Sequence, residues 1–126
     1  MKRPLPEPSG DFTESTVDSR VAYEGGFLRL RHDKVRLPDG APAWREYLEH
    51  PGAVVMMAFL DDETILLERQ YRYPLRRHFV ELPAGKLEPG EPHLETARRE
   101  LVEECGYEAA EWWQIATLHP CVGYSD

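Results

Sequence analysis

The 126-residue sequence has little cysteine and no long apolar run. Its two cysteines, Cys105 and Cys121, are too few for a disulfide framework and lack the short spacing of a zinc ribbon or redox pair. No segment approaches the roughly 20 apolar residues of a transmembrane helix. The basic residues near the start are not followed by the apolar stretch of a signal peptide. These absences predict a cytoplasmic protein with reduced thiols and no membrane partner.

The sequence also lacks an excess of positive charge, since its net charge is −8. A broad basic surface for nucleic acid is therefore not expected. Acidic side chains concentrate in residues 81–111, whereas arginines gather in residues 29–36 and 69–77. If both kinds of segment line one cleft, the cleft suits an anionic ligand held by arginines and by a carboxylate-bound metal.

Residues 1–20 are rich in Pro, Ser, Thr and acids without hydrophobic periodicity, which predicts a flexible arm or an edge segment. Residues 27–37 and 44–50 then read as two strands joined by a turn that contains Asp39-Gly40. We expect an N-terminal antiparallel hairpin over residues 21–50.

The apolar run 53–60 and the β-branched and aromatic run 64–73 predict a buried central hairpin. Further short strands are expected at residues 79–83 and 112–118. A helix is expected from Pro92 to Gly106, because Pro suits the first helical turn and Gly the position after the last. Its predicted core stripe is made of Leu94, Ala97, Leu101 and Cys105. A mixed β-sheet with this helix packed on it is the simplest two-layer α/β architecture.

Three glutamates, Glu100, Glu103 and Glu104, fall on one flank of this helix beside the apolar stripe. Like charges at these spacings repel, and anions near a helix C-terminus oppose the helix dipole. A solvated acidic face is one interpretation of the triplet. The other is a site for a hard divalent cation such as Mg²⁺, which prefers carboxylate ligands.

The preceding loop extends the triplet into a longer pattern, in which a Gly is followed after five residues by Glu and after seven more by Arg-Glu-aliphatic-x-Glu-Glu-x-Gly. The matching positions are Gly85, Glu91, Arg99, Glu100, Leu101, Glu103, Glu104 and Gly106. This pattern resembles the Nudix box. One position departs from it, because Tyr107 stands where the family prefers an aliphatic residue, and that change concerns local packing more than chemistry. Eight specified positions at fixed spacing make a chance match a poor explanation.

Glycines in the loop allow it to fold tightly over the helix start, where Glu91 could receive Arg99. The resemblance implies that the pair Glu91 and Arg99 supports the catalytic loop. It further implies metal ligands from the carboxylates of Glu100, Glu103 and Glu104 and the backbone carbonyl of Ala84, with Glu103 alternatively a base through water. The implied cofactor is Mg²⁺ or Mn²⁺, bridging a diphosphate and activating a water.

The flanking stretches YEGGFLRL, WREYLEHPGAVV, ERQYRYP, ELPAGKLEPGE and HPCVGYSD resemble the ADP-ribose pyrophosphatase branch of the family. The resemblance implies hydrolysis of ADP-ribose to AMP and ribose 5-phosphate, or of a related nucleoside diphosphate sugar. The implied substrate-binding residues are Phe27, Arg45, Glu46, Arg72, Val122 and Gly123. Phe27 could instead be a core aromatic, and Arg45 and Arg72 could be ordinary surface residues of strands.

Two departures from that branch bear on these expectations. Val122 stands where a proline is expected in the last loop, which weakens the marker for ADP-ribose. The family also continues for several strands and a helix beyond the position of Asp126, so the resemblance implies missing C-terminal elements, including a loop that often supplies a catalytic glutamate. The expected organisation is an arm at 1–20, a hairpin at 21–50 and an incomplete Nudix domain at 51–126.

Two alternatives stay open beside the leading function. One is a Nudix hydrolase of another nucleoside diphosphate derivative, and the other is a non-catalytic module that binds a nucleotide or ADP-ribose. The resemblance also implies a homodimer in which the hairpin of one subunit reaches the site of the other. Trp44 and Tyr47 are plausible apolar anchors of that interface, although Trp44 could merely cover its own sheet.

Overall fold

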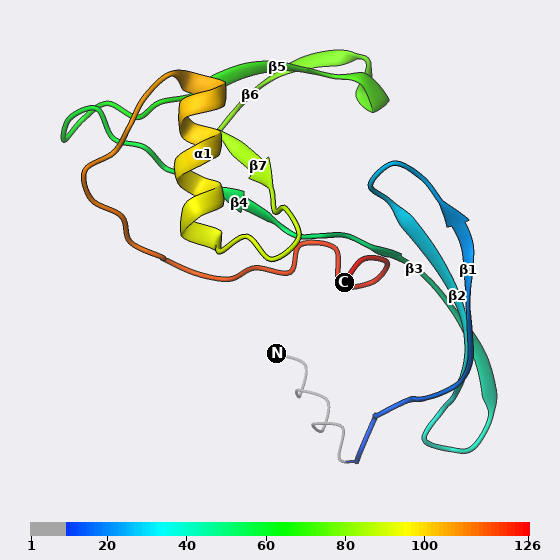
Figure 1. Ribbon diagram of the computed structural model, residues 1–126. Helices are drawn as coiled ribbons and strands as arrows, with labels where there is room; N and C mark the ends of the chain where they lie inside the picture. The colour runs from blue at the N-terminus through cyan, green and yellow to red at the C-terminus, as the bar shows by residue number, and fades with distance from the viewer. Residues whose placement is uncertain (1–9) are drawn as a thin grey trace, which may run out of the picture. The chain divides into compact units, whose positions relative to one another are not determined.

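The computed structural model describes residues 10–126, which form two compact units (Figure 1). The first unit consists of the described part of Met1–His50 together with His119–Asp126. The second unit is Pro51–Leu118. The predicted division into an arm, a hairpin and a Nudix domain remains a prediction.

A three-stranded antiparallel sheet forms most of the first unit. Its strands are β1 (Ser15–Glu24), β2 (Arg29–Arg36) and β3 (Pro42–Glu49), paired in that order. Between β2 and β3, the Gly40 N–H donates to the Leu37 carbonyl (2.9 Å) and the Leu37 N–H to the Ala41 carbonyl (2.9 Å). This turn confirms the hairpin that the Asp39-Gly40 dipeptide predicts.

The arm or edge segment expected over residues 1–20 includes the start of an edge strand, because β1 begins at Ser15. Residues 1–9 lie outside the described part of the chain. Every residue of β1 is exposed, and its pairing with β2 is irregular between Thr16 and Asp18 and between Val21 and Tyr23. An exposed edge strand with such bulges needs no apolar alternation, so hydrophobic periodicity could not reveal it.

The last residues of the chain add to the free edge of β3. The Leu48 N–H donates to the Tyr124 carbonyl (2.8 Å), and the Asp126 N–H donates to the Leu48 carbonyl (3.2 Å). The backbone of Leu48 thereby forms a parallel bridge with Ser125, and the His50 N–H donates to Asp126 Oδ1 (2.7 Å). A segment distant in sequence therefore covers part of this sheet.

The second unit contains two short antiparallel ribbons and one helix. The ribbons pair β4 (Ala53–Val55) with β7 (Ala84–Lys86), and β5 (Glu68–Arg72) with β6 (Arg77–Glu81). A single 3-10 turn, Tyr73–Leu75, follows β5, and α1 spans His93–Cys105. The helix packs against β7 and β4 (Figure 1).

Two strand predictions in this unit are wrong. The runs 53–60 and 64–73 do not form a buried hairpin, since β4 pairs with β7. The two runs meet around the bridge between Phe59 and Ile65, where the Leu60 N–H donates to the Thr64 carbonyl (2.9 Å) and the Leu66 N–H donates to the Ala58 carbonyl (2.8 Å). Side chains such as Val55 and Met57 are at least half exposed. Residues 112–118 carry no strand, because no described segment pairs with them. An apolar run shows strand propensity but not which partner the strand will meet.

The predicted helix is confirmed almost to the residue. It follows Pro92 and ends at Gly106, whose φ of 72° is the left-handed conformation that glycine adopts easily. Its buried stripe includes Ala97 and Leu101, which pack with Met56 in the core of the unit. Leu94 is 41% exposed and so lies outside that core, contrary to prediction. No helix among residues 10–126 is long and apolar enough to cross a membrane.

Leu101 is the most deeply buried apolar side chain of this core, with 1% exposed, so we expect Leu101→Ala to destabilise the second unit by about 2–4 kcal/mol. Leu94→Ala on the same helix is the matched control and should cost less than about 1 kcal/mol. Urea unfolding followed by circular dichroism measures both. Equal losses in the two variants would contradict the core described here.

Candidate functional site

Arg99 of α1 connects three parts of the second unit. Its Nε and Nη2 donate to the two carboxylate oxygens of Glu91 (3.0 and 2.9 Å), which lies in the loop before the helix. Its Nη1 donates to Glu100 Oε1 (2.8 Å) and, at 3.3 Å, to Glu103. Its Nη2 also reaches the Lys86 carbonyl at 3.4 Å, at the end of β7. Arg99 is thus saturated by protein groups and holds the loop to the helix.

Glu91 receives a further hydrogen bond from the Thr96 hydroxyl at 2.8 Å, within the first turn and a half of α1. Bonds from Arg99 and Thr96 all favour the ionised carboxylate and lower the pKa of Glu91 to about 2. The same contacts with Glu91 and Glu100 raise the pKa of Arg99. The predicted pairing of Glu91 with Arg99 is therefore present in the structure.

Two box glutamates lie against the short strand β7. A Cβ added to Gly85 would come within 1.9 Å of Glu100 Cδ, so only glycine leaves room for that side chain. The next carboxylate along the helix, Glu104, accepts a hydrogen bond from the Ala84 N–H at 3.2 Å. The structure therefore brings Glu100 and Glu104 together along two consecutive residues of β7.

The surroundings of Glu104 favour its neutral form. Burial raises the pKa of Glu104, the Ala84 N–H opposes that shift, and the carboxylates of Glu68 and Glu100 add to it. Glu104 also lines a cavity of about 530 Å³, together with residues of β5 and of the segment just before β5. The lining residues are Leu66, Leu67, Glu68, Arg69, Gln70, Glu104 and Cys105. Clustered carboxylates beside a cavity are unfavourable without a positive partner.

The donor chemistry of this region fits a hard divalent cation. Mg²⁺ takes one or two carboxylates and completes its octahedron with carbonyls, water and phosphate oxygens. Glu100 and Glu104 both flank β7, where the Ala84 carbonyl is also present. Over residues 10–126 no three His, Cys, Asp or Glu side chains converge as a closed metal shell. Glu103 lies outward with 59% of its side chain exposed, bonded only to Arg99.

Arg72 is the predicted substrate residue that lies in this unit. It forms two-fold hydrogen bonds with Glu81 across the β5–β6 ribbon, with the shortest N–O distance 2.6 Å. Glu81 raises the pKa of Arg72, and Glu68 and Glu104 add smaller contributions. Arg72 thus lies within the electrostatic field of the box carboxylates.

The first unit contains a cavity of about 380 Å³ that is lined by residues of its sheet and by residues 122–126. Four of the predicted substrate residues line it: Arg45, Glu46, Val122 and Gly123. Arg45 pairs in register with Asp33, and Glu46 with His32, so their side chains leave β3 toward opposite faces. A ligand that contacts both must therefore lie at the edge of β3.

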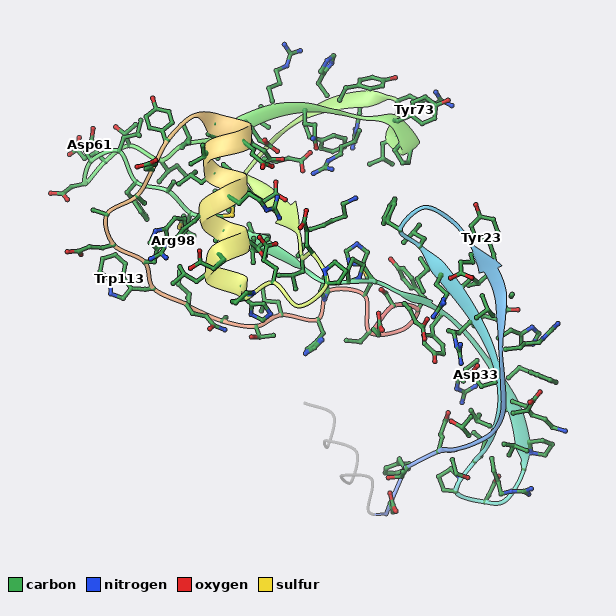
Figure 2. All side chains as sticks on the ribbon, in the orientation of Figure 1. Tyr23, Asp33, Asp61, Tyr73, Arg98 and Trp113 are labelled. Atoms are coloured by element: carbon green, nitrogen blue, oxygen red, sulfur yellow. The ribbon has the colours of Figure 1, made fainter. Side chains whose placement is uncertain are left out.

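The fifth predicted residue of this unit, Phe27, precedes β2. Its ring is 55% exposed and lies edge-on to His50 with 6.1 Å between ring centroids. That exposure contradicts the alternative of a core aromatic and leaves a ring face for stacking. Figure 2 shows the side chains of both units, with Asp33 on the sheet of the first and Arg98 on α1 of the second.

Two protein-family models match this chain. Residues 49–125 match the model of the NUDIX domain, and residues 14–48 match that of the nucleoside diphosphate sugar hydrolase N-terminal domain. The chain belongs to the Nudix family. The resemblance read from the box is thereby confirmed.

Curated relatives are similar over most of this chain. An ADP-ribose pyrophosphatase of Bacillus subtilis (strain 168) is 41% identical over 113 residues, 90% of this chain and 61% of its own length. A second, from Mycobacterium tuberculosis (strain ATCC 25618 / H37Rv), is 42% identical over 88% of this chain and 54% of its own. A methanol dehydrogenase activator of Bacillus methanolicus is 40% identical over 91% of this chain. The Nudix chain therefore spans between 54% and 62% of the length of these relatives.

Among solved structures, an ADP compounds hydrolase superposes with a TM-score of 0.79 at 20% identity. The match covers 93% of this chain and 64% of the other. The likeness supports the expected α/β Nudix fold.

Several residues that interact with the predicted site residues were not predicted from the sequence. Thr96 lies on the helix face of Arg99 and Glu100, so helical spacing could have indicated it. Glu68 stands next to Glu104 only through the tertiary fold. Glu14 belongs to no sequence pattern, and its carboxylate accepts a hydrogen bond from Arg45, which is 31 residues away in the sequence.

The ion pair between Glu91 and Arg99 predicts that the stability of the chain depends on pH. The pKa of Glu91 falls from an ordinary value of 4.5 to about 2 in the folded chain, so its contribution to stability is complete above pH 4.5 and is lost as pH falls toward 2. We expect Glu91→Gln to lower the melting temperature at pH 7, and the gap to the parent chain to narrow below pH 4. Thermal unfolding at pH 7, 5, 4 and 3 measures it, and a gap independent of pH would contradict the ion pair.

Proposed function

We propose that this protein hydrolyses the diphosphate bond of ADP-ribose, or of a related nucleoside diphosphate sugar, in a metal-dependent reaction. For ADP-ribose, water adds to one phosphorus, the bridging P–O bond breaks, and the products are AMP and ribose 5-phosphate. Two relatives about 41% identical to this chain are named ADP-ribose pyrophosphatases, and the N-terminal model describes nucleoside diphosphate sugar hydrolases. The cytoplasmic location predicted from the sequence stays a prediction.

The observation that carries this proposal is the placement of two box carboxylates at β7 by the Glu91–Arg99 network. Glu100 and Glu104, with the Ala84 carbonyl, would hold Mg²⁺ or Mn²⁺, and Glu103 is free to bind through water or to accept a proton from it. A bound divalent ion would neutralise the diphosphate and lower the pKa of a water molecule. Without it, the carboxylates alone would repel an anionic substrate.

The remaining proposed roles concern the substrate. Arg72 and Arg45 contact phosphate oxygens, for which the guanidinium fork is suited. Phe27 stacks on the base with its exposed ring face. Glu46 accepts hydrogen bonds from hydroxyls, and the backbone at Val122 and Gly123 closes the cavity of the first unit. Arg99 has no part in binding substrate, because its donors are already used within the protein.

The metal site is tested by Glu104→Gln, with Glu100→Gln beside it. Each removes an anionic oxygen ligand, so we expect a loss of Mn²⁺ affinity on the order of 100-fold, and a comparable loss of Mg²⁺-dependent turnover. The fold should be retained, and Glu104→Gln should be slightly stabilising because like-charge repulsion on the helix is relieved. Electron paramagnetic resonance titration with Mn²⁺ reports binding, and release of AMP from ADP-ribose reports turnover.

Glu95→Gln is the matched control for this experiment. Glu95 lies on the same helix, is 54% exposed and pairs with Arg98 at 2.9 Å, away from β7. It should leave Mn²⁺ affinity unchanged. Near-normal Mn²⁺ binding by both Glu100→Gln and Glu104→Gln would show that these carboxylates do not hold the metal.

We further propose a homodimer in which residues 20–50 of one subunit reach the metal site of the other. Trp44 is 54% exposed, although its ring also contacts His32 at 4.5 Å within its own sheet. Tyr47 is half-buried and donates to Asp33 (3.1 Å). Trp44 and Tyr47 lie on opposite faces of β3, and each is of the aromatic type that interfaces favour.

Mixing Glu104→Gln chains with Arg45→Ala chains tests whether the sites are shared. In a mixed dimer one site then has an intact metal centre and an intact Arg45, and the other has neither. Activity should recover to about one quarter of normal at equal amounts, when half the dimers are mixed. Turnover of ADP-ribose before and after subunit exchange measures it. No recovery despite demonstrated exchange would mean that each chain completes its own site.

A further inference from the structure

The guanidinium of Arg45 already has an anionic partner within its own chain. Its Nε donates to Glu14 Oε2 at 2.9 Å, and its Nη2 donates to Glu14 Oε1. The third nitrogen, Nη1, donates to the Trp44 carbonyl at 2.9 Å. Nε and Nη2 form the edge that would make two parallel bonds to a phosphate, so Glu14 occupies the position a phosphate would take.

The cavity around this pair is poor in positive charge. Among the described residues that line it, four carry carboxylates, Glu14, Asp33, Glu46 and Asp126, and Arg45 supplies the guanidinium. Asp33 is itself satisfied by the hydroxyls of Ser19 and Tyr47, at 2.5 and 3.1 Å. An anion entering the cavity would therefore meet repulsion and no available guanidinium edge while Glu14 remains in place.

The pair is built so that it can exchange partners. Glu14 precedes β1, its side chain is 32% exposed, and that of Arg45 is 45% exposed. Ion pairs with this exposure contribute little to stability. A diphosphate carries more charge than a carboxylate and would displace Glu14 at little cost to the fold.

We infer that Glu14 is a positioning residue that competes with the substrate phosphates for Arg45 and thereby sets the affinity of the site for phosphorylated ligands. Before substrate binds, Glu14 holds the guanidinium extended across the sheet. When a phosphate arrives, it takes the Nε and Nη2 edge and Glu14 returns to solvent. The inference rests on the proposed function, in which Arg45 contacts phosphate.

Binding without turnover provides the test, using the full chain in EDTA at fixed salt and pH. Glu14→Gln weakens the competitor, so we expect the Kd for ADP-ribose and for AMP, measured by titration calorimetry, to fall about threefold to fivefold. The Kd for adenosine, which has no phosphate, should not change. The gain should vanish in the double variant Glu14→Gln/Arg45→Ala, because there is no guanidinium left to compete for.

Glu24→Gln is the matched control. Glu24 also lies on the first sheet, accepts two bonds from Arg29 (3.2 and 2.7 Å) and does not line the cavity, so this variant removes the same charge from an equivalent pair. Its Kd for AMP should stay at the parent value. An equal gain in Glu24→Gln would show a general charge effect and overturn the inference.

The remaining outcomes separate the inference from the proposed function. If Arg45→Ala weakens AMP binding but Glu14→Gln does not strengthen it, the role of Glu14 is wrong and that of Arg45 stands. If Arg45→Ala changes the Kd neither in the parent chain nor in the Glu14→Gln chain, Arg45 does not contact phosphate, and both are overturned. A tighter Kd for adenosine in Glu14→Gln would place the effect on the nucleoside and would also overturn the inference.

Discussion

The contacts of Arg99 are the interaction on which the candidate catalytic region depends. One guanidinium joins the loop at Glu91, the helix at Glu100 and the end of β7 at the Lys86 carbonyl. Without it, the loop would have no charged tie to the helix, and two carboxylates would face one another unbalanced. Contacts within the protein therefore hold the loop, the helix and β7 in one arrangement.

The two flanks of α1 differ, because one packs in the core and the other carries the glutamates of the Nudix box. Leu101 and Ala97 anchor it in a small core, while its other flank carries glutamates at spacings that repel. Gly85 removes the one Cβ that would exclude Glu100 from β7. A fold selected for stability alone would have placed neither the repeated acids nor the glycine there, so these features belong to the Nudix box and not to the packing of the helix.

The first unit has a polar cavity on a small sheet. Residues 122–126 return to the edge of β3 and cover Asp33 and Val35, which are otherwise on a solvent-facing side. The ion pair of Glu14 with Arg45 closes the same cavity from the other end of the sheet. Arg45 and Asp33 are bonded to protein groups there, which limits what a ligand can contact without exchanging a partner.

Features that depend on local spacing could be predicted from the order of the amino acids: the turn at Asp39-Gly40, the helix between Pro92 and Gly106, and the Nudix box. Turn chemistry, helix termini and one-face periodicity act over a few residues, so they can be read without a structure. Other features follow from how the chain folds in three dimensions: the pairing of β4 with β7, the exposed strand β1, the absence of a strand at residues 112–118, and the ion pair of Glu14 with Arg45. These depend on which distant segments meet, and the free energy of such pairing comes from contacts that neither segment encodes alone.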